Sequence, residues 1–361
     1  MNIVAATKSY EAWARARIPL LKVDLRHKHE TMAAAAFPFL RGSFYRWVQR
    51  YPEICPDLAD TPSVLAVGDL HIENFGTWRD AEGRLLWGVN DFDEAIRLPY
   101  ANDLVRLAVS ALLAIDEDRL AIGKTDACAA ILAGYGEGIA AGEAIPFVLE
   151  EKNAELRAMA SGKQRSPVRF WGKLTGLRPV AAPKPVAQLL KAELPDTARF
   201  ERFAHRIAGI GSLGRERYLA LARDEGGWIA REAKRTLPSA YCWAHGMAEP
   251  RPHIAEIAAH AALASDPFLR IGEDWLLRRL GPHCSRIELE DFPKRRDERI
   301  ILGAMGRETA NIHLGSAAAA KVKRDIERRT NREPRWLLAA ARAMAEDTVA
   351  DWRQWRRHRR R

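Results

Sequence analysis

Residues 63–95 of the chain read SVLAVGDLHIENFGTWRDAEGRLLWGVNDFDEA, and in this stretch two acidic clusters each follow an apolar, strand-like run. Asp69 follows the first run, Asn74 lies five positions later, and Asp91 follows the second run. Transfer of a γ-phosphoryl group requires a carboxylate that orients the attacking hydroxyl and hard oxygen ligands that hold Mg²⁺ against the phosphates. The stretch therefore predicts a phosphoryl-transfer site.

The two apolar runs are expected to pair as a β-hairpin. They cover residues 64–67 and 85–90, and the segment DAEG at 80–83 has turn-forming composition. Such a hairpin would bring the three polar residues to one edge of a sheet. The competing interpretation is that each carboxylate is a hydrogen-bonded turn former, which is common at strand ends. An Asp, a His and an Asn in one short loop, followed by a second acidic strand end, favour the catalytic interpretation.

These residues resemble the catalytic loop of the kinase-like superfamily, in its aminoglycoside-phosphotransferase branch. The pattern GD-x-H-x-x-N is matched by Gly68-Asp69, His71 and Asn74, and the metal-binding run by Asp91-Phe92-Asp93-Glu94. The resemblance implies that Asp69 orients or deprotonates an acceptor hydroxyl, that His71 orients the loop, and that Asn74 and Asp91 hold Mg²⁺. Asp93 would support a second ion.

Beyond the loop, two further features match the family and one position departs from the pattern of protein kinases. Asp103 matches the family's buried aspartate, which braces the catalytic loop from a helix, whereas Val67 stands where protein kinases often have a histidine. Together with FPFLRG at residues 37–42, these motifs make the whole chain similar to the bacterial family known as domain of unknown function 2252. That family name implies no substrate.

A glycine-rich segment, GIGSLG at residues 209–214, follows much later in the chain. In a Rossmann fold such a segment leads from a strand into a helix. Here a strand-like run at 218–222, a turn at 224–227 and a second strand-like run at 228–233 follow it. This context favours the glycine loop of a kinase, which covers the phosphates of ATP within a hairpin. Its candidate phosphate-binding residues are Gly209, Gly211, Ser212 and Gly214.

The second strand of this hairpin should carry the cation that pairs with the phosphates. Counting from the first glycine places Arg231 at that position, where the family has lysine. Arginine keeps the charge but does not replace an ammonium group point for point. Lys234 is the alternative candidate for this cation, and its side chain would point to the opposite face of the strand from Arg231. Glu256, on an Ala-rich predicted helix, is the expected ion-pair partner of Arg231.

The remaining kinase-like motifs follow in order. A hairpin of residues 275–280 and 286–290 suits the hinge between two lobes, and residues 302–313 resemble the helix that precedes the catalytic loop. Because these motifs follow the catalytic loop in the chain, the sequence predicts an α+β, two-lobed, circularly permuted kinase-like fold. The predicted parts are an N-terminal helical extension at 1–60, a catalytic part at 61–200, a nucleotide-binding part at 201–295, and a helical return with a basic tail at 296–361.

Composition is consistent with two lobes and limits other classes. The chain has 361 residues, 47% hydrophobic and 29% charged, which is ordinary for a globular protein of more than one core. It contains no apolar run of membrane-spanning length, and its four cysteines have no paired spacing, so we expect a cytoplasmic protein without a membrane partner.

The last ten residues, WRQWRRHRRR, concentrate part of the formal charge of +10. Arginines that neutralise phosphates and tryptophans that stack on bases would suit a nucleic-acid partner. The alternative is an amphipathic terminal helix whose tryptophans pack inward, and the mixed charge of the remaining chain favours it.

Taken together, the motifs predict an enzyme that transfers a phosphoryl group from ATP, with Mg²⁺, to the hydroxyl of a small-molecule or macromolecular acceptor. Nucleotidyl transfer and ATP binding without catalysis are the alternatives within the same fold, because of the departures at Val67 and Arg231. A basic nucleic-acid-binding protein is the alternative of another class.

Overall fold

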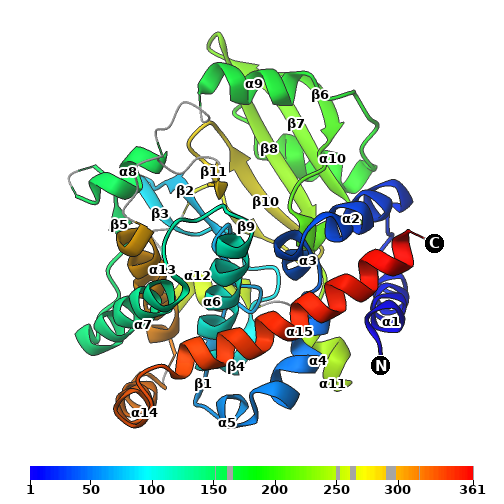
Figure 1. The fold of residues 1–361 in the computed structure, drawn as a ribbon. Coiled ribbons are helices and arrows are strands. Elements are labelled where there is room, and N and C mark those ends of the chain that lie inside the picture. The colour runs from blue at the N-terminus through cyan, green and yellow to red at the C-terminus, as the bar shows by residue number, and fades with distance from the viewer. Residues whose placement is uncertain are drawn as a thin grey trace.

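The computed structural model describes residues 1–150, 152–160, 166–248, 253–260, 266–289, 298–316 and 318–360. It contains both helices and antiparallel strands, which confirms the predicted α+β class (Figure 1). None of the described helices combines the length and the apolar composition that crossing a membrane requires.

Most of the helices form one body around α6 (Figure 1). Helix α6 is almost entirely buried, because apolar residues dominate its sequence and its buried polar side chains, such as Asp103 and Arg106, have hydrogen-bond partners. The helices of this body are α1 (Ile3–Arg15), α2 (Lys22–Ala34), α3 (Ala36–Gly42), α4 (Phe44–Ile54), α5 (Pro56–Ala59), α6 (Tyr100–Asp116), α7 (Lys124–Ala141), α8 (Ala154–Ala160), α13 (Glu298–Leu314), α14 (Ala319–Arg332) and α15 (Trp336–Arg359).

Helices α7 and α13 approach each other at backbone distance. A Cβ atom on Gly134 would lie 1.9 Å from the carbonyl oxygen of Gly303, so only glycine fits at this crossing. The close packing fixes α13 beside the smaller sheets of the same body.

The strands of the helical body form two small sheets. One pairs β1 (Ser63–Ala66) with β4 (Ile96–Pro99), and the other has the order β11 (Ser285–Arg286), β2 (Phe75–Arg79), β3 (Leu85–Val89), β5 (Phe147–Val148). The predicted pairing of the runs 64–67 and 85–90 is therefore wrong. The turn at 80–83 instead joins β2 to β3, and β1 finds its partner across the acidic segment. The error arose because both pairings give the same alternation of apolar residues.

The second body is a five-stranded antiparallel sheet with the order β6 (Arg199–His205), β7 (Arg217–Asp224), β8 (Gly227–Arg235), β10 (Trp275–Leu280), β9 (Arg270–Ile271). Helices α9 (Pro167–Thr175) and α10 (Lys184–Ala192) supply Leu174, Val186 and Leu190 to two apolar clusters on this sheet. These two helices precede the predicted boundary at 200/201 yet pack on the sheet. The boundary at 295/296 lies outside the described residues.

Two short helices, α11 (Ala240–His245) and α12 (Ile254–His260), contribute apolar side chains to the main hydrophobic core, and α11 packs on α4 and α1. The predicted hinge hairpin differs from the structure. Strand β10 belongs to the five-stranded sheet, whereas Ser285–Arg286 pairs with β2 in the helical body. The segment from β10 to β11 therefore crosses from one body to the other. Glu290, at the end of the predicted hairpin, is outside the described residues.

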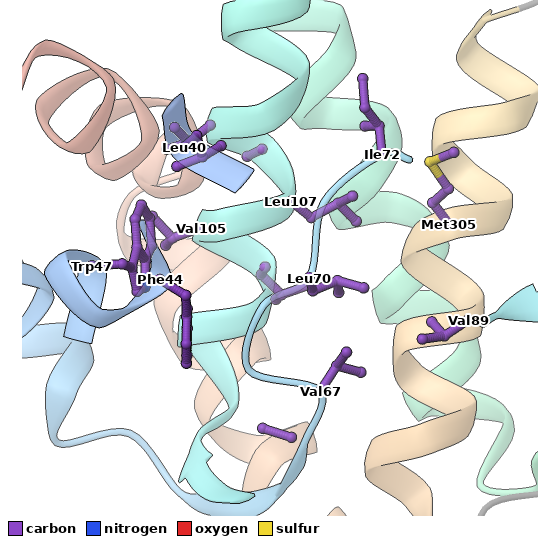
Figure 2. Close-up of a cluster of buried hydrophobic side chains, with 14 of the residues drawn as sticks. Leu40, Phe44, Trp47, Val67, Leu70, Ile72, Val89, Val105, Leu107 and Met305 are labelled. Carbon is purple, nitrogen blue, oxygen red and sulfur yellow. The ribbon is translucent and has the colours of Figure 1, made fainter. Parts of the chain in front are cut away.

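The main hydrophobic core holds the acidic loop that follows β1. Figure 2 shows Val67, Leu70 and Ile72 following one another along this loop, with Leu107 of α6 between Leu70 and Ile72 and Met305 of α13 on the side of Ile72. All three loop residues are buried. These three apolar side chains therefore anchor the loop in the core.

A buried carboxyl group on α13 gives the fold a pH dependence. Glu308 is 3% exposed, accepts a hydrogen bond of 2.9 Å from Asn311, and faces Gly88 of β3. Burial raises the pKa of Glu308 to about 7 from an ordinary value of 4.5. The folded state therefore holds this proton more tightly than the unfolded chain does. Its contribution is complete below about pH 4.5 and is lost as the pH rises to about 7.

We therefore expect Glu308→Gln to be more stable than the wild type at pH 8, by on the order of 3 kcal/mol, and of similar stability near pH 4.5. Urea unfolding of both proteins across this range measures the difference. Glu137→Gln, at an exposed position of α7, is the matched control. Parallel pH profiles of Glu308→Gln and wild type would contradict the assignment.

Candidate active site

The loop between β1 and β2 carries the candidate catalytic residues, and Asp103 of α6 holds its backbone. Asp103 is fully buried and accepts hydrogen bonds from the N–H groups of Val67 (2.7 Å) and Gly68 (3.0 Å). His313 Nε2 lies 3.2 Å from the same carboxylate. The loop is thus braced from a helix, as the sequence predicts, and α13 contributes a second support.

Gly68 allows the loop to turn. Its φ is +81°, a left-handed conformation that favours glycine, and a Cβ atom there would lie 2.5 Å from the carbonyl oxygen of Glu94. The catalytic loop therefore packs directly on the acidic segment that begins at Asp91.

Asn74 connects the two acidic clusters. Its side-chain amide donates hydrogen bonds of 3.1 Å to the carbonyl oxygens of Asp69 and Asp91. The N–H of Asn90 donates to the carbonyl oxygen of Asn74 at 2.9 Å. Although the predicted hairpin was wrong, the three residues do meet, and all three line one polar cavity.

The glycine-rich segment joins β6 to β7 and so lies between two antiparallel strands. It forms a single 3₁₀ turn at Ile210–Ser212 and leads into a strand, which excludes a Rossmann-type turn. A Cβ atom on Gly211 would lie 3.3 Å from Asp69 Oδ2, and Gly209, Gly211 and Ser212 line the polar cavity. Gly214 lies behind the loop, against Leu25 of α2.

Two buried cations face the acidic segment: Arg215, which pairs with Asp93 and Glu94, and Lys234 of β8. The ammonium group of Lys234 lies 3.0 Å from Asp91 Oδ2 and also pairs with Asp93, and the lysine is 2% exposed. Burial would raise the pKa of Asp91, but Lys234 and Arg278 outweigh it and hold the pKa below its ordinary value. The acid therefore carries its charge at neutral pH.

The predicted Arg231–Glu256 ion pair is wrong. Arg231 has the opposite strand parity to Lys234, donates to the carbonyl oxygen of Glu193 at 2.9 Å, and lies over the ring of Phe268. Glu256 pairs instead with Arg97 and His253. The predicted position of the cation is therefore on the correct strand, β8, but on the opposite face of the sheet from Lys234.

Arg106 of α6 contacts the candidate base, a contact that the sequence did not predict. Its Nε donates to Asp69 Oδ1 at 2.8 Å, and the arginine is fully buried. Burial raises the pKa of Asp69 above its ordinary value, while Arg106 opposes this shift. Because Arg106 binds Oδ1, the other oxygen of Asp69 is the one directed at Gly211.

His71 is buried beside Asp69 and uncharged. Burial, together with Arg41 and Arg106, holds the pKa of His71 well below its ordinary value. Its Nδ1 atom has no hydrogen-bond partner among the described residues. The neutral ring can donate or accept a hydrogen bond within the cavity that it lines.

A layer of arginines lies on the sheet next to the glycine-rich segment, and sequence analysis also missed it. The fully buried carboxylate of Glu232 binds three guanidinium groups, those of Arg206 (2.8 Å), Arg217 (3.2 Å) and Arg278 (2.7 Å). Arg217 also donates to Ser212 Oγ at 2.9 Å. Three cations with one carboxylate leave excess positive charge beside the loop. Because Glu232 and Lys234 are two residues apart, the strand pattern predicts that they share a face of the sheet. It does not predict the arginines from other strands that bind Glu232.

The amino-terminal helices hold the glycine-rich segment in place. Lys28 of α2 donates to the carbonyl oxygen of Gly211 at 2.9 Å, and the N–H of Leu21 donates to that of Gly214 at 2.8 Å. Burial lowers the pKa of Lys28 to about 8. The sequence of α2 alone does not predict the contact between Lys28 and Gly211.

A second, mostly apolar cavity adjoins the polar one at Asp91, which lines both. Counting open solvent, it encloses about 830 Å³. It lies between β2–β3 and β8–β10, with α12 on one side, and Lys234 lines it as well. Apolar walls with a few convergent polar groups are typical of small-molecule sites.

The two tryptophans of the basic tail pack inward. Trp355 is 3% exposed and donates to the carbonyl oxygen of His29, and Trp352 donates to that of Ala33. The terminal segment is thus an amphipathic helix, and these two rings are engaged within the fold.

A family model described as "Uncharacterized protein conserved in bacteria (DUF2252)" matches residues 20–167 and 184–358. No curated protein and no solved structure matches the chain. The matched ranges contain the loop of Asp69, the glycine-rich segment and Lys234, so the candidate site lies within the part that defines the family.

Proposed function

The chain belongs to the DUF2252 family, and we propose that it is a kinase-like phosphotransferase that uses ATP and Mg²⁺ to phosphorylate a hydroxyl group. One observation carries the proposal. Asp69, Asp91 and Gly211 line one cavity, with Lys234 bound to Asp91, although more than a hundred residues separate the two halves of this set.

The donor set fits a magnesium ion bound to a nucleotide. No group of three or more His, Cys, Asp or Glu side chains among the described residues could hold a metal on its own. Mg²⁺ characteristically uses one or two protein carboxylates and takes its remaining ligands from water and phosphates. Asn74 and Asp91 would hold the ion, with Asp93 beside it. When bound, the ion would neutralise negative charge on the phosphates.

The protein groups have distinct parts in the reaction. Lys234 and the glycine-rich segment would bind and position the phosphates, with the arginine layer adding positive potential beside them. The apolar cavity would take the nucleoside. Asp69 Oδ2 would accept the proton of the acceptor hydroxyl, and its bond to Arg106 would fix the orientation of the carboxylate.

We further propose that the fold is a circularly permuted version of the kinase-like arrangement. The end of α13 lies against β1, since Leu65 N donates to Ser316 Oγ at 2.7 Å and His313 reaches Asp103. In an unpermuted order this helix would lead directly into that strand. Helix α1 also packs on α15, so the two ends of the chain lie on the same side of the molecule (Figure 1).

The Arg106–Asp69 pair also favours a second candidate, a protein that binds ATP without transferring its phosphoryl group. A buried guanidinium weakens a carboxylate as a proton acceptor. Nucleotidyl transfer would use the same nucleotide site. Both alternatives retain Mg²⁺-dependent nucleotide binding, so turnover is what separates them from the phosphotransferase. Nucleic-acid binding through the exposed arginines of α15 stays a separate prediction.

Thermal unfolding with ATP, with and without Mg²⁺, tests the proposal. We expect ATP to stabilise the protein only when Mg²⁺ is present, by about 2.7 kcal/mol at a hundredfold excess over Kd. Asp91→Asn should remove this stabilisation, while Asp116→Asn, an exposed control on α6, should retain it. Stabilisation by RNA and none by Mg²⁺-ATP would instead favour the nucleic-acid-binding alternative.

A further inference from the structure

We propose that the polar cavity contains a subsite for the acceptor, built by Arg41 and Arg286, and this inference rests on the proposed function. The acceptor would be a hydroxyl compound that carries a phosphate or carboxylate group. Arg41, His71 and Arg286 line the polar cavity but not the apolar one. None of these three side chains has a part in the proposed nucleotide site, so they are available to a second ligand in the same cavity.

Arg41 belongs to the FPFLRG motif at residues 37–42, which the nucleotide site does not use. It is 9% exposed and pairs with Glu73, and its Nε has no hydrogen-bond partner among the described residues. Its carbonyl oxygen lies beside Gly211, at 3.3 Å from where a Cβ atom would stand. A buried N–H group without a partner, on a cationic side chain that lines the cavity, is suited to bind an anion.

The motif also explains how Arg41 is held. The ring of Phe37 lies 5.6 Å from the Arg41 guanidinium carbon and 5.1 Å from that of Arg119. Both arginines share the carboxylate of Glu73, which also accepts the N–H of Leu289 at 3.2 Å. One negative charge thus serves two cations, so the group keeps a net positive charge.

Arg286 adds a second cation on the same wall. It comes from β11, its side chain is 30% exposed, and it pairs with Glu288 at 2.9 Å. Burial, followed by repulsion from Arg286, lowers the pKa of Arg41 to about 10, which shows that the two cations act on the same space. A phosphate or carboxylate between them would relieve this repulsion, because guanidinium groups bind such anions in a fork.

These two guanidinium groups favour an acceptor that carries a phosphate or carboxylate group, which would bind against this wall. Five carboxylate residues line the same cavity, so Arg41 and Arg286 fix where the anionic group binds and do not set the total charge of the acceptor; these are Asp69, Glu73, Asp91, Asp93 and Glu94. With the anionic group of the acceptor bound by Arg41 and Arg286, its hydroxyl oxygen would bond to the γ-phosphorus of ATP. The bond from that phosphorus to the bridging oxygen would break, ADP would leave with the electron pair, and the hydroxyl proton would pass to Asp69.

Calorimetric titration of the whole chain with inorganic phosphate tests the subsite. It is performed with and without a saturating non-hydrolysable ATP analogue and Mg²⁺, and repeated with malonate to compare a carboxylate with a phosphate. We expect the wild type to bind at least one of the two anions in both conditions. Arg286→Gln should weaken that binding at least tenfold while leaving affinity for the nucleotide analogue unchanged.

The matched control is Arg84→Gln, at an exposed arginine of the β2–β3 turn outside both cavities, which should bind like the wild type. Arg41→Lys tests the buried member, and we expect it to fold and to bind the anion more weakly than the wild type. Failure of the wild type to bind either anion, or equal binding by Arg286→Gln, would overturn the subsite. Loss of nucleotide binding in the wild type would instead remove the proposed function, and titration without nucleotide would still report on Arg41 and Arg286.

Discussion

Replacing Lys234 with methionine is expected to abolish Mg²⁺-ATP binding, whereas replacing Arg231 with methionine is expected to leave it unchanged. Lys234 is buried and faces Asp91 at 3.0 Å, on the side of β8 that meets the acidic clusters. Methionine has a similar length but no charge, so the phosphates would lose their buried cation. Calorimetric titration with ATP and Mg²⁺ measures both affinities directly.

Arg231→Met is the matched control because it removes a buried cation from the same strand. The two variants together therefore test which side of β8 faces the nucleotide. Lys234→Met should also be less stable than the wild type, since Asp91 and Asp93 lose their shared partner. Lys234→Arg retains the charge and should fold like the wild type. Loss of ATP binding in Arg231→Met, with binding intact in Lys234→Met, would reverse the assignment.

Replacing Asp69 with asparagine is expected to stop phosphoryl transfer while Mg²⁺-ATP still binds. A positioned base contributes about 10²- to 10⁴-fold to such reactions, and asparagine cannot accept the hydroxyl proton. Release of phosphate from ATP, with water as the acceptor in the absence of the true one, should fall by that factor. Nucleotide affinity should change little, because Lys234, Asp91 and the glycine-rich segment remain.

The control for this variant is Asp116→Asn, an exposed aspartate near the end of α6. If Asp69→Asn releases phosphate as fast as the wild type, Asp69 serves only as the partner of Arg106 and transfer does not depend on it. If the wild type itself binds Mg²⁺-ATP without any turnover, ATP binding without catalysis is the better description.

Local patterns in the sequence were sufficient to find the loop of the candidate site. The spacing of Asp69, His71 and Asn74 after one apolar run, with Asp91 after the next, marks this segment whichever strands pair. Strand-like residues after the glycine-rich segment likewise predicted its hairpin context. Such features depend only on neighbours in the chain.

Contacts between distant segments could not be predicted in the same way. The pairing of β1 with β4, rather than with β3, depends on how the chain returns after Asp91, and both choices bury the same residues. Counting from a glycine placed the cation at Arg231, but strand parity assigns that position to the opposite face. Arg106, Lys28 and the partners of Glu232 contact residues on other elements, and no pattern in their own segments pairs them, so only their positions in the fold show what they contact.

The most direct test is a crystal structure of the protein with Mg²⁺ and a non-hydrolysable ATP analogue. We expect the ion at Asn74 and Asp91, the phosphates between Lys234 and the glycine-rich segment, and the γ-phosphate nearest Asp69. An analogue bound at a different surface, or phosphates that contact neither Lys234 nor Gly211, would contradict the proposed phosphotransferase site.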